Sequence, residues 1–482
     1  MESSKLIQLL LTFTSRELSK LEDFVVSPYF NKNKDVVNLC SYLVKYLHHK
    51  RRDIKLSKST IIKHVFQTIA TDHPHFNMTF NRLLSLVYDF LIYENQQPLR
   101  LTQQCGLLSQ LRQKEKTKDY NGILRKIKNT PTDYNHIEDQ YWDQFLLHNE
   151  LDISFITSGG RSFDKNLQEK NDYLDLFFIT KKLKIACDMV SRNKVISSDY
   201  KYRLVDELFV YLDQMDSPYK DEPSIQVYAS LFKMLSQQTD DHYQFVLQKL
   251  DSYANQFSIS EQRSIYDFVL NYLIGKYNQH TGQTSYLDEI LNLYKMLVEK
   301  KIIYINGYLP TWEYKTIVTT AISLGYLEWT GLFIEQYKTE LPLDARDHSY
   351  AYNMSYYKYM RKDYKGALLA LYDVNFNDWR YYTGAKMIQL RSYFELDEEE
   401  PFYSLIDAFR VYLDRKGTMP ENQKKLYRNF IKLAAKLYKL RLKSELGHPE
   451  MSMEMKQLRK QIEDQNVASK NWLIDSLSKL LP

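Results

Sequence analysis

The chain has 482 residues, of which only 13 are glycines and 12 are prolines, about 5% together where the average share is about 12%. Chains so poor in these residues seldom build many short strands joined by tight turns, because several turn types need residues that accept positive φ. The composition therefore disfavours all-β, collagen-like and disordered classes, whereas 44% hydrophobic and 26% charged residues are typical of a soluble globular protein.

The formal net charge of +5 hides an uneven distribution along the chain. Residues 1–130 carry a net charge of +10, residues 131–416 carry −11 and residues 417–482 carry +6. Basic ends around an acidic middle are compatible with nucleic acid at one end, with an acidic partner, or with contacts between the ends and the middle. A solvated surface with unevenly spread charge explains the same numbers.

The N-terminal residues lack the apolar core and small-residue cleavage site of a secretory signal. No window reaches the length of uninterrupted apolar sequence that a membrane-spanning helix needs. The three cysteines, Cys40, Cys105 and Cys187, are far apart and lie in apolar helical contexts. Buried free thiols in a reducing compartment are the simplest interpretation, so we expect a cytoplasmic protein.

Residues 1–98 are expected to form a basic helical module with helices near 3–26, 35–48, 58–70 and 77–95. Thr14 and Glu17 have the spacing of a capping box, in which each side chain accepts a hydrogen bond from the other residue's backbone amide. A serine followed by Pro28 predicts the end of that helix.

Residues 99–341 are expected to form helical hairpins. The predicted breaks lie at Thr130 with Pro131, at residues 158–160, at Ser217 with Pro218, and at residues 307–310. Ser258 and Glu261 repeat the capping-box spacing, and Pro310 predicts a helix start at Thr311. Over the whole chain the apolar periodicity predicts on the order of twenty helices and no strand.

Residues 342–482 contain a repeat. Asp363, Tyr364 and Ala367 follow a helical pattern in which Met354 and Ser355 take the places of a Leu-Gly pair. At a period of 34 residues, Ala351 falls on Ala385 and Met354 on Ile388, and a related hairpin precedes the pattern over 321–334. This segment, about 312–416, resembles the tetratricopeptide repeat. We therefore expect an α-α superhelix whose last 141 residues are tetratricopeptide-like repeats followed by C-terminal capping helices.

The resemblance implies a concave face, lined by the first helix of each hairpin, that binds peptides or helices. The residues expected to point inward are Tyr352, Asn353, Tyr356, Tyr359, Lys386 and Tyr393. As an alternative, each tyrosine fills space between stacked helices and bonds only through its hydroxyl group. A carboxylate clamp is not expected, because Tyr356 and Leu390 occupy the clamp positions.

Leucine and phenylalanine side chains from Leu426 to Leu440 are spaced four and three residues apart, as in a heptad seam, with lysines around them. This helix, expected to start at Glu421, could seat a partner helix or an acidic surface. The other interpretation is that it packs on the last hairpin, with Trp472 and Leu477 of the terminal helix closing the stack.

The sequence contains no phosphate-binding loop, dinucleotide fingerprint, zinc-protease motif or paired Cys-x-x-Cys. Asp72, His73 and His75 have ligand chemistry, but nothing nearby completes a zinc site. We therefore expect no enzyme activity, no cofactor and no metal. The prediction is a non-catalytic protein-interaction scaffold or adaptor of the helical-repeat type, with a protein or peptide partner.

A nucleic-acid-associated regulator is the alternative function. Two basic helices near the N-terminus have the length of a loose helix-turn-helix, and the local excess of positive charge is strong. The candidate contacts are Lys50, Arg51, Arg52, Asn81 and Arg82.

Overall fold

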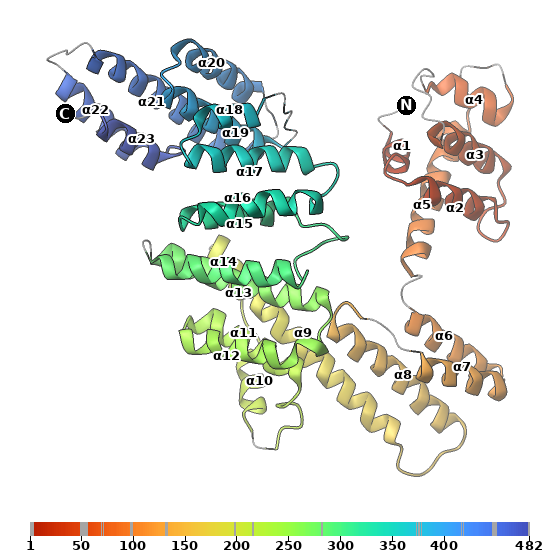
Figure 1. Cartoon of the computed structure of the whole chain (residues 1–482). Coiled ribbons are helices and arrows are strands. Elements are labelled where there is room, and N and C mark those ends of the chain that lie inside the picture. The colour runs from red at the N-terminus through yellow and green to blue at the C-terminus, as the bar shows by residue number, and fades with distance from the viewer. Residues whose placement is uncertain are drawn as a thin grey trace. The chain divides into compact units, whose positions relative to one another are not determined.

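The computed structural model describes residues 4–48, 56–68, 70, 72–96, 100–130, 134–196, 199–214, 216–280, 283–372, 374, 376, 378–415, 417, 419–445 and 451–480. Within these ranges every regular element is a helix, apart from one isolated antiparallel bridge between Ile305 and Tyr308. The predicted all-α fold is confirmed (Figure 1). The chain forms two compact units: unit 1 comprises residues 1–133 and 139–177, and unit 2 comprises residues 134–138 and 178–482. The three sequence regions expected above stay a prediction.

The first part of unit 1 is a five-helix cluster. Its helices are α1 (Lys5–Leu10), α2 (Ser15–Val26), α3 (Lys34–His48), α4 (Lys58–Phe66) and α5 (Phe76–Gln96). Their apolar faces meet in one core, in which Leu21, Leu43, Ile61 and Leu83 are completely buried.

The capping box at Thr14 forms in full. The Thr14 amide donates to Glu17 Oε2 at 2.7 Å, and the Glu17 amide donates to Thr14 Oγ1 at 3.2 Å. Because an N-cap residue has extended rather than helical backbone, the cap also separates α1 from α2. The single helix expected over 3–26 is therefore wrong, and the chain has two helices there.

The second part of unit 1 has a smaller core of its own. It is built from α6 (Arg100–Gln113), α7 (Thr117–Asn129) and α8 (Ile137–Thr157), with Leu108 and Leu147 among its buried residues. Arg112 pairs with Glu150 at 2.8 Å. The helix α9 (Lys165–Ile196) follows, and the division into units falls within both α8 and α9.

Unit 2 continues with helices joined in hairpins. They are α10 (Val205–Leu212), α11 (Pro223–Gln237), α12 (Asp240–Tyr253), α13 (Ile259–Gln279), α14 (Thr284–Glu299), α15 (Thr311–Ser323), α16 (Leu327–Tyr337), α17 (Arg346–Met360), α18 (Tyr364–Ala370), α19 (Trp379–Glu395), α20 (Glu399–Arg415), α21 (Glu421–Glu445), α22 (Met451–Asp464) and α23 (Lys470–Ser478). Two short 3-10 turns, Ala254–Gln256 and Lys338–Glu340, follow α12 and α16. The expected helix starts at Thr311 and Glu421 are confirmed.

From α11 onwards each helix packs chiefly on its neighbours in the sequence (Figure 1). Each of the hairpins α11/α12, α13/α14, α15/α16 and α17/α18 is closed by contact between its two helices, and α15, α17 and α19 also contact one another in order. A lone hairpin cannot cover its apolar faces, so each one is completed by the next. This packing between consecutive helices is consistent with the expected superhelix.

Small residues allow close approach between successive hairpins. A Cβ atom added at Gly384 of α19 would lie 2.7 Å from Cε2 of Tyr352 on α17. At Gly331 of α16 it would lie 2.6 Å from the hydroxyl oxygen of Tyr357. Ala351 and Ala385, which the 34-residue period aligns, are both buried. The tyrosine rings therefore occupy space that these residues leave.

The heptad seam of α21 is occupied within the chain. Phe430, Leu433 and Leu437 are completely buried, and they share one core with Leu473 and Leu477 of α23. Packing on the terminal helix, rather than a seat for a partner helix, is therefore confirmed for this seam.

Candidate interaction surface

Aromatic and basic side chains meet on three consecutive helices of unit 2. We call this group the Lys–Tyr surface, and it consists of Trp312 and Lys315 on α15, Tyr352, Tyr356 and Tyr359 on α17, and Tyr381, Tyr382, Lys386 and Arg391 on α19. The three helices contact one another in this order. Each basic side chain of the group lies over at least one tyrosine ring.

Lys315 has the largest aromatic environment. Its Nζ lies 4.6 Å from the ring centre of Tyr352, 5.3 Å from that of Tyr381 and 5.5 Å from that of Trp312. The two tyrosine rings meet edge to face at 5.1 Å, and the Tyr381 hydroxyl donates to the Thr311 carbonyl at 3.0 Å. Burial lowers the pKa of Lys315, because a charged amine is disfavoured away from water.

Lys386 and Arg391 are the other two cations of the surface. Lys386 Nζ lies 5.3 Å from the ring centre of Tyr382 and donates to Gln389 Oε1 at 3.0 Å. Burial lowers the pKa of Lys386 as well. The Arg391 guanidinium lies 4.8 Å from the ring centre of Tyr359, and its Nε donates to the Met387 carbonyl at 3.2 Å.

None of these three cations forms an ion pair with a carboxylate of the residues that the structure describes. Asp378, whose charge acts on Lys315, pairs with Arg380 at 3.5 Å, and Glu313 pairs with Arg263 at 3.5 Å. Protein interiors usually pair their cations. The Lys–Tyr surface therefore gathers three partly exposed cations that form no ion pair within the described chain.

The structure brings some of the predicted contact residues together but does not expose all of them. Tyr352 and Tyr359 are each 8% exposed and Asn353 is fully buried, with its amide nitrogen donating to the Ser349 carbonyl. These three residues pack between helices, as the space-filling alternative expects. Tyr356 and Lys386 are partly exposed on the Lys–Tyr surface.

The sixth predicted residue, Tyr393, is partly exposed and packs against the core that α19 shares with α20 and α21. The sequence analysis missed Trp312, Lys315, Tyr381, Tyr382 and Arg391. A signal existed for three of these, because Tyr382 and Lys386 stand four residues apart and Trp312 and Lys315 three apart, the spacings that place side chains on one helical face.

The nucleic-acid candidates are only partly visible. Lys50, Arg51 and Arg52 lie outside the described residues. Asn81 and Arg82 are exposed on α5, while the opposite face of that helix, including Leu83 and Val87, is buried in the core of the five-helix cluster.

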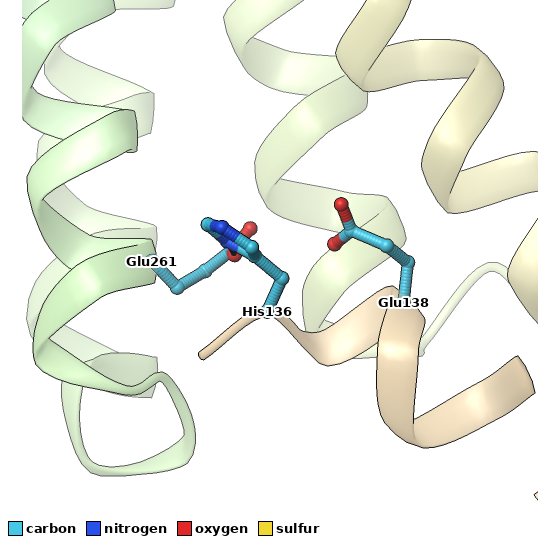
Figure 2. Close-up of side chains that lie close together, drawn as sticks. All are labelled: His136, Glu138 and Glu261. Atoms are coloured by element: carbon cyan, nitrogen blue, oxygen red, sulfur yellow. Dashed lines mark hydrogen bonds and ion pairs between the residues drawn. The ribbon is translucent and has the colours of Figure 1, made fainter. Parts of the chain in front are cut away.

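A second group of polar residues, which the sequence analysis did not find, lies inside unit 2. Figure 2 shows His136, which immediately precedes α8, and Glu138, in the first turn of α8, pointing toward Glu261 on α13. His136 Nδ1 lies 2.6 Å from Glu261 Oε2. The ammonium of Lys184 on α9 lies 3.1 Å from Glu138 Oε1, 3.2 Å from Glu261 Oε2 and 3.3 Å from His136 Nδ1.

We call these residues, with Lys181 and Tyr228, the ionic cluster. The Tyr228 hydroxyl donates to Glu261 Oε1, and Lys181 lies 3.1 Å from Glu138 Oε1. Burial and the Glu261 charge raise the pKa of Tyr228. Burial alone would raise the pKa of Glu138, but the charge of Lys184 and hydrogen bonds from Lys181 and Lys184 outweigh it and lower the pKa.

His136, Glu138 and Glu261 could each offer one ligand atom to a metal ion, and these atoms lie within 4.8 Å of one another. The Lys184 ammonium, however, already sits within 3.3 Å of all three residues. A metal would have to displace that charge from between two buried carboxylates. The arrangement therefore fits an internal ion pair network better than a metal centre.

The ionic cluster borders a cavity of about 760 Å³ whose lining includes Lys181, Lys184, Ser264, Asp267 and Asn271. The lining is of mixed charge, with acids and bases interspersed. Nothing in it favours one class of ligand, and the cavity thus adds no chemistry to the cluster.

No helix in the described ranges combines the length and apolar character that crossing a membrane requires. Comparison with known proteins gives no match to a family model, to a curated protein or to a solved structure.

Proposed function

We propose that this chain is a non-catalytic protein-interaction scaffold of the tetratricopeptide-like type, and that its partner binds the Lys–Tyr surface. The observation that carries the proposal is the set of Lys315, Lys386 and Arg391, each lying over tyrosine and none paired with a carboxylate in the described chain. Aromatic residues and arginine are enriched where proteins bind one another.

The position of the surface supports the same function. It lies on α15, α17 and α19, the first helices of three successive hairpins, which are the elements that line the binding face in tetratricopeptide repeats. The polar cluster best suited to chemistry, around Glu261, holds a lysine at its centre. We further propose a cytoplasmic location, because the free thiols Cys40, Cys105 and Cys187 are all buried and free thiols persist in reducing compartments.

Site-specific photo-crosslinking in the native cell tests the proposal. A photoreactive phenylalanine analogue at Tyr356 or Tyr382 is expected to give the same discrete protein adduct, which disappears when Lys315 and Lys386 are both changed to glutamate. Tyr372, which is 78% exposed after α18, provides the control position. Absence of an adduct, or an adduct that survives both charge reversals, would contradict the proposal.

The nucleic-acid alternative has its own measurement. If the basic N-terminal module bound a duplex, the logarithm of the binding constant would fall steeply with the logarithm of salt concentration, because phosphate contacts release counterions. A slope near zero for a labelled duplex with the full chain removes this alternative.

A further inference from the structure

We propose that the occupant of the Lys–Tyr surface is an acidic protein segment in extended conformation, with carboxylates two or three residues apart. The inference rests on the proposed function and names its partner. It follows from the charge, the spacing and the surroundings of the three cations.

The first step is charge complementarity. Lys315, Lys386 and Arg391 are partly withdrawn from water and form no ion pair with a carboxylate of the described chain. A cation in such a place is stabilised when an opposite charge arrives, and the attraction is stronger there than at an open surface. A ligand that carries carboxylates supplies the ion-pair partners that these three cations lack in the described chain.

The second step is spacing. Lys315 lies over Tyr352 and Arg391 over Tyr359, and these tyrosines are two helical turns apart, about 10 Å along α17. Lys386 and Arg391 are separated by about 7.5 Å along α19 on the same rise per residue. In an extended chain, side chains two residues apart are about 7 Å from each other and those three apart about 10 Å. The side-chain spacings of an extended segment thus match these separations along the two helix axes.

The third step concerns rigidity. Each cation is held over at least one ring, and the rings of Tyr352 and Tyr381 are themselves fixed by packing and by the hydrogen bond to Thr311. A side chain held in place before binding loses less conformational freedom when the ligand arrives. The surface is therefore suited to recognise a fixed pattern of carboxylates.

The surroundings favour a short acidic segment over a nucleic acid. Residues 131–416, which contain the whole surface, have a net charge of −11. A nucleic acid carries a negative charge at every nucleotide. Away from the three local cations it would be repelled by the net negative charge of this region. A protein segment with a few carboxylates meets the cations and avoids most of the repulsion.

Fluorescence anisotropy with the purified full chain tests the inference. The probes are labelled twelve-residue peptides with aspartates spaced by two or three residues, the same peptides with asparagine, a peptide with its aspartates adjacent, and single-stranded DNA of equal length. We expect the spaced aspartate peptides to bind at least about 10-fold more tightly than the asparagine peptides, because a charge pair in a partly desolvated site contributes at least this factor to the binding constant. Tighter binding of the DNA, or equal binding of aspartate and asparagine peptides, overturns the inference.

Variants of the chain test whether peptide binding depends on the cations of the Lys–Tyr surface. Changing Lys315 and Lys386 together to methionine should weaken the spaced aspartate peptides at least about 10-fold. Lys295 of α14 is the matched control, because its Nζ also lies over an aromatic ring, that of Trp329 at 4.6 Å, but outside the surface. An equal loss with Lys295→Met would overturn the inference.

The two proposals fail in different ways. If the photo-crosslinked adduct at Tyr356 forms and depends on Lys315 and Lys386 while no acidic peptide binds, the partner is not an extended acidic segment and only this inference fails. If neither adduct nor peptide binding occurs, the scaffold proposal fails as well.

Discussion

The Lys184 ammonium lies 3.2 Å from Oε2 of Glu261, a side chain that is completely buried. The same ammonium is 3.1 Å from Glu138 Oε1, so that one lysine on α9 balances carboxylates on two other helices. Such a cluster adds little stability compared with an apolar core, but it is costly to break. It therefore fixes which segments pack together.

Replacing Lys184 by methionine should strongly destabilise unit 2. Glu138 and Glu261 would remain buried with less compensating charge, and breaking a buried pair in this way costs about 3–5 kcal/mol. Lys181→Met is the control, because the Lys181 side chain is 44% exposed and exposed pairs contribute about 0–1 kcal/mol. Denaturant unfolding followed by circular dichroism measures both, and equal losses would contradict the assignment of Lys184 as the central cation.

The stability that Glu138 contributes should depend on pH in the acid range. Its pKa is lowered in the folded chain from the ordinary value of 4.5, so the unfolded chain binds the proton more readily. The contribution is present above pH 4.5 and is lost as the pH falls through the folded value. The difference in melting temperature between the native chain and Glu138→Gln should therefore be constant near neutral pH and shrink below about pH 4.5. A constant difference down to pH 3 would argue against a charged Glu138.

Lys315 and Lys386 should reduce stability at neutral pH. Burial lowers the pKa of both lysines below 10.5, so folding releases protons near that range and stability rises with pH there. At neutral pH the charged amine is disfavoured by burial, so Lys315→Met should raise the melting temperature. A clear fall in melting temperature would mean that Lys315 has a compensating partner.

Gly384→Ala should displace the ring of Tyr352 and thereby disturb the Lys–Tyr surface. The new Cβ would lie 2.7 Å from the ring of Tyr352, and overpacking of this kind costs about 1–3 kcal/mol, more than the gain of about 1 kcal/mol in helix propensity. Gly275→Ala in α13 meets nothing within 4 Å and should stabilise the chain instead. Thermal unfolding of the two variants gives the comparison, and equal shifts would contradict the close approach of α17 and α19.

The three thiols should be unreactive in the folded protein. Burial raises the pKa of Cys40 and of Cys105 to about 12 and raises that of Cys187 further, and only the thiolate reacts with disulfide reagents. Titration with such a reagent at pH 8 should find almost no free thiol until denaturant is added, and then three. Rapid labelling of one cysteine in the native chain would show that its helix opens easily.

Local signals in the sequence predict local structure well, as the two capping boxes show. Thr14 and Glu17 form the complete box. At Ser258 only half of it forms: the hydroxyl accepts the Glu261 amide at 3.0 Å, but the Glu261 carboxylate turns instead to Lys184, His136 and Tyr228. The pattern fixes the helix start, whereas the direction of the carboxylate depends on charges elsewhere in the chain.

The candidate surface and the ionic cluster were harder to foresee because they are assembled across distance. The repeat identifies α17 and α19 as neighbours, which is why Tyr356 and Lys386 could be predicted. Lys315 comes from the preceding hairpin, where the repeat is weaker. His136 and Glu261 are 125 residues apart, and no periodicity relates them.

Because His136 and Glu261 are far apart in the sequence, they are synthesised at different times. His136 leaves the ribosome 125 residues before Glu261, while the segment that follows it, residues 139–177, belongs to unit 1. His136 therefore meets Glu261 only after α13 has been translated, whereas Glu138 can already pair with Lys181 and Lys184 of α9. The five-helix cluster can form first, but the ionic cluster is complete only after more than half of the chain exists, which places it among the slow, non-local steps of folding.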